Sequence, residues 1–287
     1  MQDTVGIYYI NLASRPDRRA FMEAQFEKLG LVAERVEAVT PDDLTEAQFK
    51  ENCLPHRPLG RAPGEVACSL SHIKAWKRFL TSGHSACVVL EDDALLSSQL
   101  PEVLNAMSER RWGIEMMRLE TVGAPLRLSK PISEFGQNFE VRRLYSGCTH
   151  TTGYALGVEA AHAMLQPIDY LHIPIDIVTF NPYGHARRRV EFSQITPAVV
   201  VSLAFLRHPE ISVDRYLVET WAEAGEAQSD LLAERDWREG TEWSARSLTN
   251  HLKVAFLNIK GELIAGPSKF MQDYFWKIKK YKVPFCS

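Results

Sequence analysis

The sequence of 287 residues is 45% hydrophobic and 24% charged, which excludes disordered and fibrous classes and allows one large or two small domains. Its formal net charge of -3, with acids and bases mixed along the chain, excludes an overall field that would recruit nucleic acid. The five cysteines are an odd number without a Cys-x-x-Cys pair or zinc-ligand spacing, so we interpret them as reduced, mostly buried thiols.

The N-terminal sequence predicts a β-α-β unit. Residues 5–12 are rich in β-branched and aromatic side chains and predict a strand, and no basic segment precedes them as it would in a signal peptide. Pro16 near the start of the next segment and Gly30 at its end predict a helix that ends at Leu29. Residues 36–39 predict a second strand, and this succession implies a parallel sheet.

The next region predicts an insertion, a helix and a central strand. Residues 40–63 carry four prolines without a clean period and predict a long irregular insertion over the sheet. Residues 65–80 have helical periodicity. The apolar stripe of this helix consists of Val66, Leu70, Ile73, Trp76 and Leu80. The uninterrupted apolar run at residues 86–90 predicts a central strand covered by helices on both faces.

Shorter elements are predicted in the second half of the chain, namely strands at residues 114–119, 139–145 and 151–158 and a helix at residues 159–165. After Arg207 the sequence becomes polar and helix-compatible, so we predict two units, residues 1–210 and residues 211–287, the second of them helical. The longest apolar stretch, residues 198–206, is far shorter than the ~20 residues of a membrane-spanning helix, which favours a cytoplasmic protein.

Three adjacent acids, Glu91, Asp92 and Asp93, directly follow the predicted central strand. They stand at its carboxyl end, where open α/β sheets bind ligands. Because adjacent carboxylates repel one another, a partly buried cluster needs a cation, and hard oxygen ligands suit Mg²⁺ or Mn²⁺, which in turn holds a diphosphate. The alternative is a solvated strand end whose acids cap the next turn.

Basic and imidazole side chains lie on the neighbouring predicted elements. Arg15 and Arg18 follow the first strand and are candidates to contact phosphates. His72 lies at the border of the apolar helical stripe, so it either faces the cleft beside the acids or is a satisfied buried histidine.

Several segments in fixed order carry a family resemblance. They are Ile10-Asn11-Leu12 with Arg15 and Arg18, residues 34–39, the sequence PGEVACSLSHIKAW at residues 63–76, and Val89-Leu90-Glu91-Asp92-Asp93. Together they resemble glycosyltransferase family 25, the lipooligosaccharide biosynthesis transferases, which include bacterial β-galactosyltransferases and relatives of collagen galactosyltransferases. Weaker similarity at residues 152–156 and 174–176 extends the resemblance over roughly residues 5–180.

The resemblance implies an α/β fold of the GT-A type, with a Rossmann-like, mostly parallel sheet flanked by helices. It implies a UDP-sugar donor, with galactose favoured, a lipooligosaccharide or lipopolysaccharide acceptor, and inversion at the anomeric carbon. Asp93 is then the expected ligand of Mn²⁺ or Mg²⁺. The expected donor-binding residues are Asn11, Arg15, Arg18, His72, Glu91 and Asp92.

Asp176 occupies the family's downstream motif position, and the resemblance makes it the expected base that takes the proton of the acceptor hydroxyl. The alternative role for Asp176 is a helix N-cap. Two rival functions stay open at this stage. A nucleotidyltransferase would share the sheet and the acids but should carry a Gly-rich loop after its first strand, whereas a non-catalytic carbohydrate-binding protein would bind sugar without metal or nucleotide.

The C-terminal segment at residues 268–282 combines aromatic residues at helical spacing with five lysines. It predicts a basic amphipathic helix in peripheral contact with the cytoplasmic leaflet of the inner membrane, where a glycolipid acceptor is reached. The alternative is a C-terminal helix that docks its aromatic face on the core.

Overall fold

The computed structural model describes residues 4–52, 62–166, 174–181, 189–205 and 279–286. Its strands are β1 (Val5–Asn11), β2 (Glu34–Glu37), β3 (Ala86–Glu91), β4 (Ala94–Leu96), β5 (Glu115–Arg118), β6 (Glu120–Thr121), β7 (Pro125–Phe135), β8 (Phe139–Leu144), β9 (Gly153–Gly157), β10 (Glu191–Thr196), β11 (Val200–Ser202) and β12 (Lys279–Lys282). Its α-helices are α1 (Pro16–Leu29), α2 (Glu46–Asn52), α3 (Pro63–Leu80), α4 (Leu100–Ser108), α5 (Val158–Leu165) and α6 (Ile175–Thr179). The 3₁₀ turns in these ranges are η1 (Pro41–Asp43) and η3 (Leu203–Phe205).

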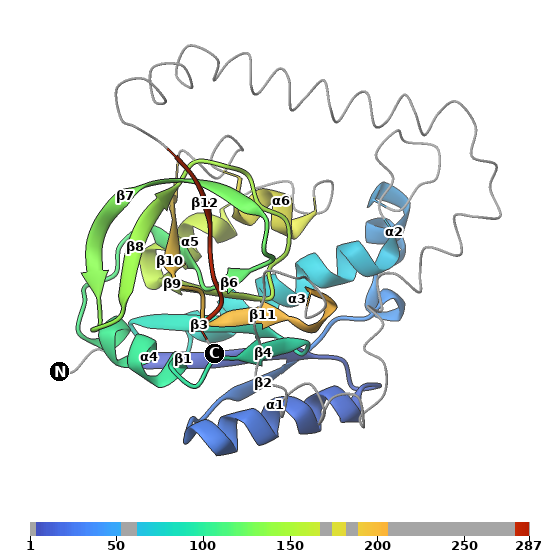
Figure 1. Cartoon of the computed structure of the whole chain (residues 1–287). Helices are drawn as coiled ribbons and strands as arrows, with labels where there is room; N and C mark the ends of the chain where they lie inside the picture. Colours follow the sequence, from blue (N-terminus) through green and yellow to red (C-terminus); the bar gives the residue numbers. More distant parts are fainter. Residues whose placement is uncertain (1–3, 53–61, 167–173, 182–188, 206–278, 287) are drawn as a thin grey trace, which may run out of the picture.

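A nine-stranded sheet with the order β12-β7-β8-β10-β5-β9-β3-β1-β2 forms the centre of the fold (Figure 1). Alternate side chains of β1 enter two different cores. Tyr8 and Ile10 join a cluster with apolar residues of α3, α5 and α6, whereas Ile7 and Tyr9 join a cluster with residues of α1 and α4. Helices therefore cover both faces of the central strands, which explains why β3 is an uninterrupted apolar run.

The predicted β-α-β unit is confirmed. Gly30 ends α1 with φ of 65°, a left-handed conformation that favours glycine. The second strand lies two residues earlier than predicted, because residues 34–37 pair in parallel with Tyr8–Asn11 of β1. The later predicted strands and helix correspond to β5, β8, β9 and α5.

Residues 40–63 are not wholly irregular, since η1 and α2 form within them. At the start of α2 the Thr45 backbone N–H donates to Gln48 Oε1 at 2.9 Å, and the Gln48 N–H donates back to Thr45 Oγ1 at 3.2 Å. This reciprocal pair is a capping box, a helix-start signal that the proline-rich composition obscured.

The buried face of α3 differs from the predicted stripe. Leu70, Ile73 and Leu80 are only partly buried, and small or polar side chains take their places in the interior. Ser71 shows the reason, because its Oγ donates to the Ala67 carbonyl at 2.8 Å and accepts the Val39 N–H at 2.8 Å. Satisfied polar groups can be buried where a hydrophobic pattern does not place them.

The predicted parallel arrangement is confirmed for β1, which pairs in parallel with β2 and β3. Beyond these strands the sheet is mixed, because β9 runs antiparallel to β3 and β5, and β8 runs antiparallel to β7 and β10. A parallel connection needs a long crossover, whereas the short link between β7 and β8 permits only a hairpin. The strands β5 and β10 also pair in parallel, so parallel pairs occur in both halves of a sheet that is mixed overall.

The end of the predicted C-terminal extension returns to the main sheet, in which β12 pairs antiparallel with β7. The expected helix is thus wrong for Lys279–Lys282, because the edge of β7 offers backbone hydrogen bonds to an extended segment. Val283 is buried, and the Tyr281 ring lies under the Arg142 guanidinium at 4.5 Å. Residues 206–278 lie outside the described part of the chain, so contact of residues 268–282 with a membrane stays a prediction.

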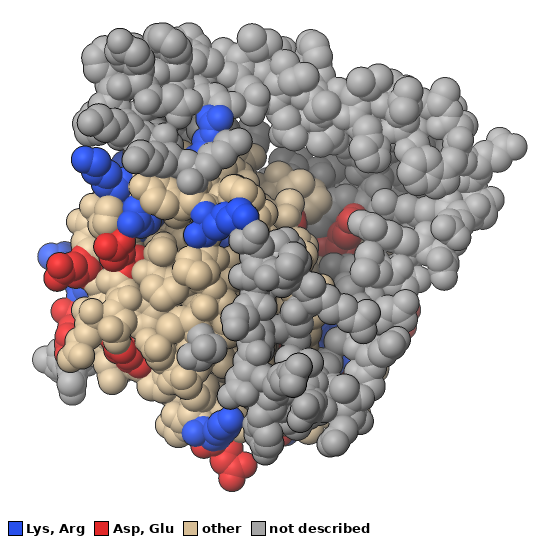
Figure 2. Space-filling view, viewed as in Figure 1, with Lys and Arg blue, Asp and Glu red and all other residues tan. Residues whose placement is uncertain are grey.

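The surface carries charges of both signs, and the helices were compared with the length and polarity of a membrane-spanning helix. On the face drawn in Figure 2, the described basic and acidic side chains are interspersed. Within the described ranges, every helix is too short or too polar to cross a membrane.

Candidate functional site

The three acids lie at the carboxyl end of β3, where Glu91 is the last strand residue and Asp92 and Asp93 follow it. Because β1 and β3 are parallel, their carboxyl ends meet at one edge of the sheet, where open α/β sheets bind ligands. An open pocket lies at this edge. It is lined by Ile10, Leu12, Arg18, Ala38, Val39, Pro41, Gly64, Ala67, Cys68, Ser71, His72, Glu91, Asp92 and Asp93.

Asp92 is held by two side chains from the first β-α unit. Asn11 Nδ2 donates to Asp92 Oδ2 at 2.8 Å, and Arg18 Nη1 donates to Asp92 Oδ1 at 3.0 Å. Burial raises the pKa of Asp92, against the opposing effects of the Arg18 charge and these hydrogen bonds. Both carboxylate oxygens are therefore engaged, and Asp92 fixes Arg18 against the wall of the pocket.

Asp93 is the acid with the most perturbed environment. Its Oδ2 accepts a hydrogen bond from Ser202 Oγ at 2.7 Å, and its buried Oδ1 has no hydrogen-bond partner among the described residues. Burial and the negative charge of Glu91 raise the pKa of Asp93 to about 7. A carboxylate oxygen that is buried without a hydrogen-bond partner fits a bound cation. The cation would provide a partner for this oxygen and a positive charge that balances the carboxylate.

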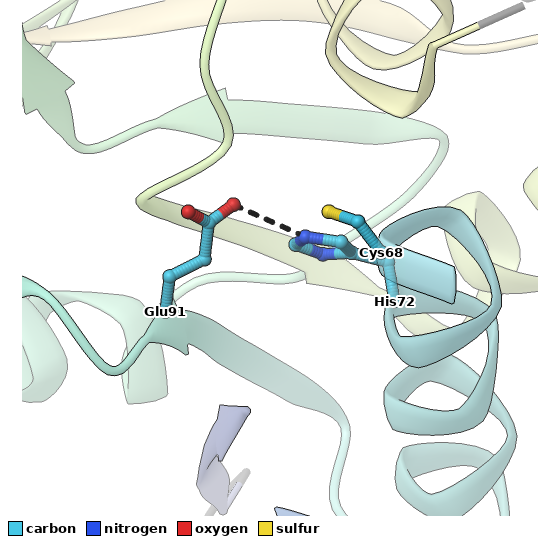
Figure 3. A group of neighbouring side chains, drawn as sticks. All are labelled: Cys68, His72 and Glu91. Carbon is cyan, nitrogen blue, oxygen red and sulfur yellow. Dashed lines mark hydrogen bonds and ion pairs between the residues drawn. The ribbon is translucent and has the colours of Figure 1, made fainter. Parts of the chain in front are cut away.

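Neighbouring side chains favour the ionised form of Glu91. Thr151 Oγ1 donates to Glu91 Oε1 at 2.6 Å, and His72 Nε2 lies 3.2 Å from the same oxygen (Figure 3). Burial acts to raise the pKa of Glu91, but the hydrogen bond and charge of His72 and the hydrogen bond of Thr151 outweigh it, so the pKa is lowered. The side chain keeps 30% exposure and lines the pocket as a carboxylate.

His72 combines the two roles that the sequence left as alternatives. It is 1% exposed, and its Nδ1 lies 2.9 Å from the hydroxyl of Tyr154, which accepts a hydrogen bond from Trp76 Nε1 at 2.8 Å. His72 is thus a satisfied buried histidine. Its other nitrogen nevertheless faces Glu91, and the ring lines the pocket.

The two predicted arginines differ in position. Arg18 is buried and lines the pocket. Arg15 forms an ion pair with Asp17 at 2.7 Å, with 22% of its side chain exposed. The structure therefore brings Arg18 directly to the acids, and contact of Arg15 with a phosphate stays a prediction.

Asp176 lies near the start of α6, and both of its carboxylate oxygens accept backbone hydrogen bonds. The Ile177 N–H donates to Oδ1 at 2.8 Å, and the His150 N–H donates to Oδ2 at 3.1 Å. Burial lowers the pKa of His150, while the negative charges of Asp176 and Glu91 act to raise it. His150 donates its backbone N–H to Asp176 and the next residue, Thr151, donates to Glu91, so this loop links α6 to the acidic end of β3.

The sequence was compared with models of known protein families. The model of glycosyltransferase family 25 (LPS biosynthesis protein) matches residues 4–179. The chain belongs to glycosyltransferase family 25. This match includes β1, α3, the three acids and Asp176, so the pocket of this glycosyltransferase is made by the part of the chain that defines the family.

Individual relatives agree with the assignment of this family 25 enzyme. A Haemophilus influenzae protein that bears a glycosyltransferase name is 26% identical over 219 residues, 74% of this chain and 75% of the relative. The lacto-N-neotetraose biosynthesis glycosyltransferase LgtB of Neisseria meningitidis is 28% identical over 207 residues, 67% of this chain and 73% of LgtB. A glycosyltransferase 25 family member of Drosophila pseudoobscura is 27% identical over 59% of this chain, which spans only 28% of that longer protein.

Sequence reasoning missed several residues at the pocket of the transferase. Thr151 and Ser202 hold Glu91 and Asp93, and they come from segments 60 and 109 residues away. The backbone of His150 has a φ of 74°, which is unusual for a residue other than glycine, but this angle cannot be read from the sequence. Cys68 was interpreted only as a mostly buried thiol, although it is half-buried and lines the pocket.

The raised pKa of Asp93 predicts how the metal-free transferase responds to pH. In the unfolded chain the pKa of this carboxyl is about 3.9. Between about pH 4 and about pH 7 the folded state binds the proton more tightly than the unfolded state, so the folded state loses stability as the pH rises through this range. Asp93→Asn removes this loss. With a chelator present, we expect the variant to melt at least about 2 °C above the wild type at pH 8, with a smaller difference at pH 5.

Differential scanning fluorimetry at the two pH values checks this prediction. Glu120 is also buried, with its pKa raised to about 7 first by burial, so it adds a pH dependence of the same sign. Both proteins carry Glu120, but the Asp93 charge also acts to raise the pKa of Glu120, so the difference between them measures Asp93 together with its effect on Glu120. A melting difference that does not change with pH contradicts the assigned environment of this carboxyl.

Proposed function

We propose that this transferase moves a sugar, with galactose favoured, from a UDP-sugar to a lipooligosaccharide or lipopolysaccharide acceptor, with inversion and with assistance from Mn²⁺ or Mg²⁺. The observation that carries the proposal is the convergence of Glu91, Asp92 and Asp93 with Arg18 on one pocket of a family 25 enzyme. Carboxylates and a fixed guanidinium beside each other suit a metal-bound diphosphate.

Asp93 is the proposed metal ligand. Its buried Oδ1 is left without a hydrogen bond among the described residues, and repulsion from Glu91 favours a positive charge at this place. The carboxylate oxygens of this cluster are the donors that Mg²⁺ and Mn²⁺ prefer. Such an ion, when bound, stabilises the negative charge that grows on the departing nucleotide diphosphate.

The neighbouring residues orient the donor in this proposal. Asp92, which is itself held by Asn11, holds Arg18 in place, and Arg18 offers its charge to a phosphate from the wall of the pocket. Glu91 is kept ionised by His72 and Thr151, and it is available to accept hydrogen bonds from the ribose or from water around the metal. Because these contacts exist before the donor arrives, little reorganisation is needed.

Asp176 is the proposed base on the acceptor side. Inversion needs a base on the face of the sugar opposite the leaving group, so this base must stand away from the diphosphate. Asp176 is not among the residues that line the pocket of the three acids, and it accepts the backbone N–H of His150. Backbone hydrogen bonds from His150 and Ile177 fix the carboxylate in one orientation.

A donor screen tests the proposal. The purified chain is incubated with UDP-galactose, UDP-glucose, UDP-N-acetylglucosamine and UDP-galacturonic acid, each with Mn²⁺ and with a chelator, and release of UDP is measured. We expect metal-dependent hydrolysis of one donor, fastest with UDP-galactose, because a transferase without acceptor leaks to water. With an acceptor sugar present, NMR should show a product of inverted anomeric configuration.

Two parallel assays on the same protein, one with UTP and a sugar 1-phosphate and one of sugar binding, have outcomes that overturn the proposal. Pyrophosphate release from UTP and a sugar 1-phosphate would assign a nucleotidyltransferase reaction. Binding of sugars that is unaffected by metal or UDP, without any turnover, would assign a carbohydrate-binding role.

A further inference from the structure

We propose that Cys68, His72 and Glu91 form a binding site for a soft divalent cation, Zn²⁺, distinct from the oxygen site at Asp93. One ligand atom of each residue, a sulfur, a ring nitrogen and a carboxylate oxygen, lies within 4.8 Å of the other two. Figure 3 shows the thiol and the ring side by side on α3, with the Glu91 carboxylate facing them from the end of β3.

The helix and the strand place these ligands together. Cys68 and His72 are four residues apart on α3, a spacing that puts both side chains on one face of a helix. Glu91 approaches from β3, and its Oε1 lies 3.2 Å from His72 Nε2. Two ligands from one helix and a third from another element form a site only in the folded chain.

The donor set selects the cation. Zn²⁺ binds thiolate, imidazole and carboxylate together, whereas Mg²⁺ and Mn²⁺ prefer oxygen ligands. Bond lengths of about 2.0–2.3 Å to Zn²⁺ place neighbouring ligand atoms about 3–4 Å apart, so the observed separations need only a small side-chain rotation. Cys68 is half-buried, so its thiol can rotate toward the ring of His72 and the carboxylate of Glu91, which hydrogen bonds hold in place.

Surrounding hydrogen bonds orient the ligands. His72 Nδ1 lies 2.9 Å from the Tyr154 hydroxyl, so an Nδ1–H donated to Tyr154 leaves Nε2, which is 3.2 Å from Glu91, to bind the metal once its proton has been released to solvent. Thr151 Oγ1 donates to Glu91 Oε1 and fixes the carboxylate. Metal-binding histidines and carboxylates are regularly held by such outer hydrogen bonds, which tune their affinity.

The pocket completes the coordination. Cys68, His72 and Glu91 all line it, so a fourth tetrahedral position faces open space and can take a water molecule. Three protein ligands with one exchangeable position form an open zinc site. Binding of Zn²⁺ here requires neither a nucleotide nor sugar transfer, so the inference stands apart from the proposed function.

Co²⁺ gives a direct readout of this site, because a thiolate bound to Co²⁺ absorbs in the near ultraviolet. The reduced, chelator-treated full chain is titrated with Co²⁺ and then with Zn²⁺. We expect a charge-transfer band that saturates at one equivalent of Co²⁺ and disappears when Zn²⁺ displaces it. The band should be absent in Cys68→Ser, whose Zn²⁺ affinity should fall at least about tenfold.

Matched variants separate this site from other effects. Cys286→Ser changes a half-buried thiol outside the cluster and should keep the band. Asp93→Asn should also keep it, which distinguishes this site from the proposed oxygen site. Tyr154→Phe should keep the band but weaken Zn²⁺ binding by about tenfold, because His72 loses its outer hydrogen bond.

A band that persists in Cys68→Ser, or wild-type Zn²⁺ affinity no higher than that of Cys68→Ser, overturns the proposal. Circular dichroism confirms that each variant is folded. If Cys68→Ser fails to fold, Glu91→Gln replaces it, and unchanged Zn²⁺ affinity in that variant overturns the proposal equally.

Discussion

Asp93→Asn should lower metal-stimulated sugar transfer at least about 100-fold, because it removes a charged ligand while keeping the shape of the side chain. The amide oxygen of asparagine can still accept the hydrogen bond that Ser202 Oγ gives to Asp93 at 2.7 Å. The fold should therefore be retained. Initial rates with the preferred UDP-sugar across a Mn²⁺ titration measure the effect.

Asp42→Asn provides the matched control for this experiment. Asp42 is an exposed acid of η1 and does not line the pocket. The same chemical change there should leave both the rate and its metal dependence unaltered. Activity of Asp93→Asn near that of the wild type at saturating Mn²⁺ would place the catalytic metal elsewhere or remove it from the reaction.

The acidic end of β3 was predictable because each signal for it is local. The apolar run at residues 86–90 marks a strand covered on both faces, and the next residues are acids. The direction of the chain then places Glu91, Asp92 and Asp93 at the carboxyl edge. Gly30 likewise marks the end of α1 through its left-handed φ of 65°.

The partners of those acids were not predictable because they depend on strand pairing. Ser202 reaches Asp93 because β11 pairs antiparallel with β4, which follows the acids. Thr151 reaches Glu91 because β9 pairs antiparallel with β3. Local periodicity indicates that a strand exists, but it does not say which other strand lies beside it.

The C-terminal segment shows a second limit. Aromatic residues at helical spacing together with lysines suit an amphipathic helix, but a short segment such as Lys279–Lys282 also suits a strand at a sheet edge. The free edge of β7 decides between them, since β12 pairs with it. Truncating the chain at Pro267 would therefore remove a strand of the main sheet together with any membrane contact.

Asp176→Asn should lower turnover by about 10²–10⁴-fold and leave UDP affinity within about twofold of the wild type, as expected for a base that acts mainly in the transition state. Asparagine cannot take a proton from the acceptor hydroxyl. Its amide oxygen can still accept the Ile177 N–H, which Asp176 Oδ1 accepts at 2.8 Å. Turnover at saturating donor and acceptor and calorimetric titration with UDP and Mn²⁺ measure the two quantities.

A purely structural role for Asp176 gives a different pattern. If the carboxylate serves only to order α6 and the loop at His150, its loss should lower the melting temperature and leave turnover of the folded protein high. Asp176→Ser separates these roles, because a serine hydroxyl can accept a backbone N–H at a helix start but cannot act as the base. The base assignment requires that the asparagine and serine variants both lose turnover while binding UDP normally. The N-cap of α6 is Pro174, so the sequence-based alternative of an N-cap at Asp176 is wrong. A serine variant with near-normal turnover would instead limit Asp176 to ordering the first turn of α6 and the loop at His150, and would leave the base to another side chain.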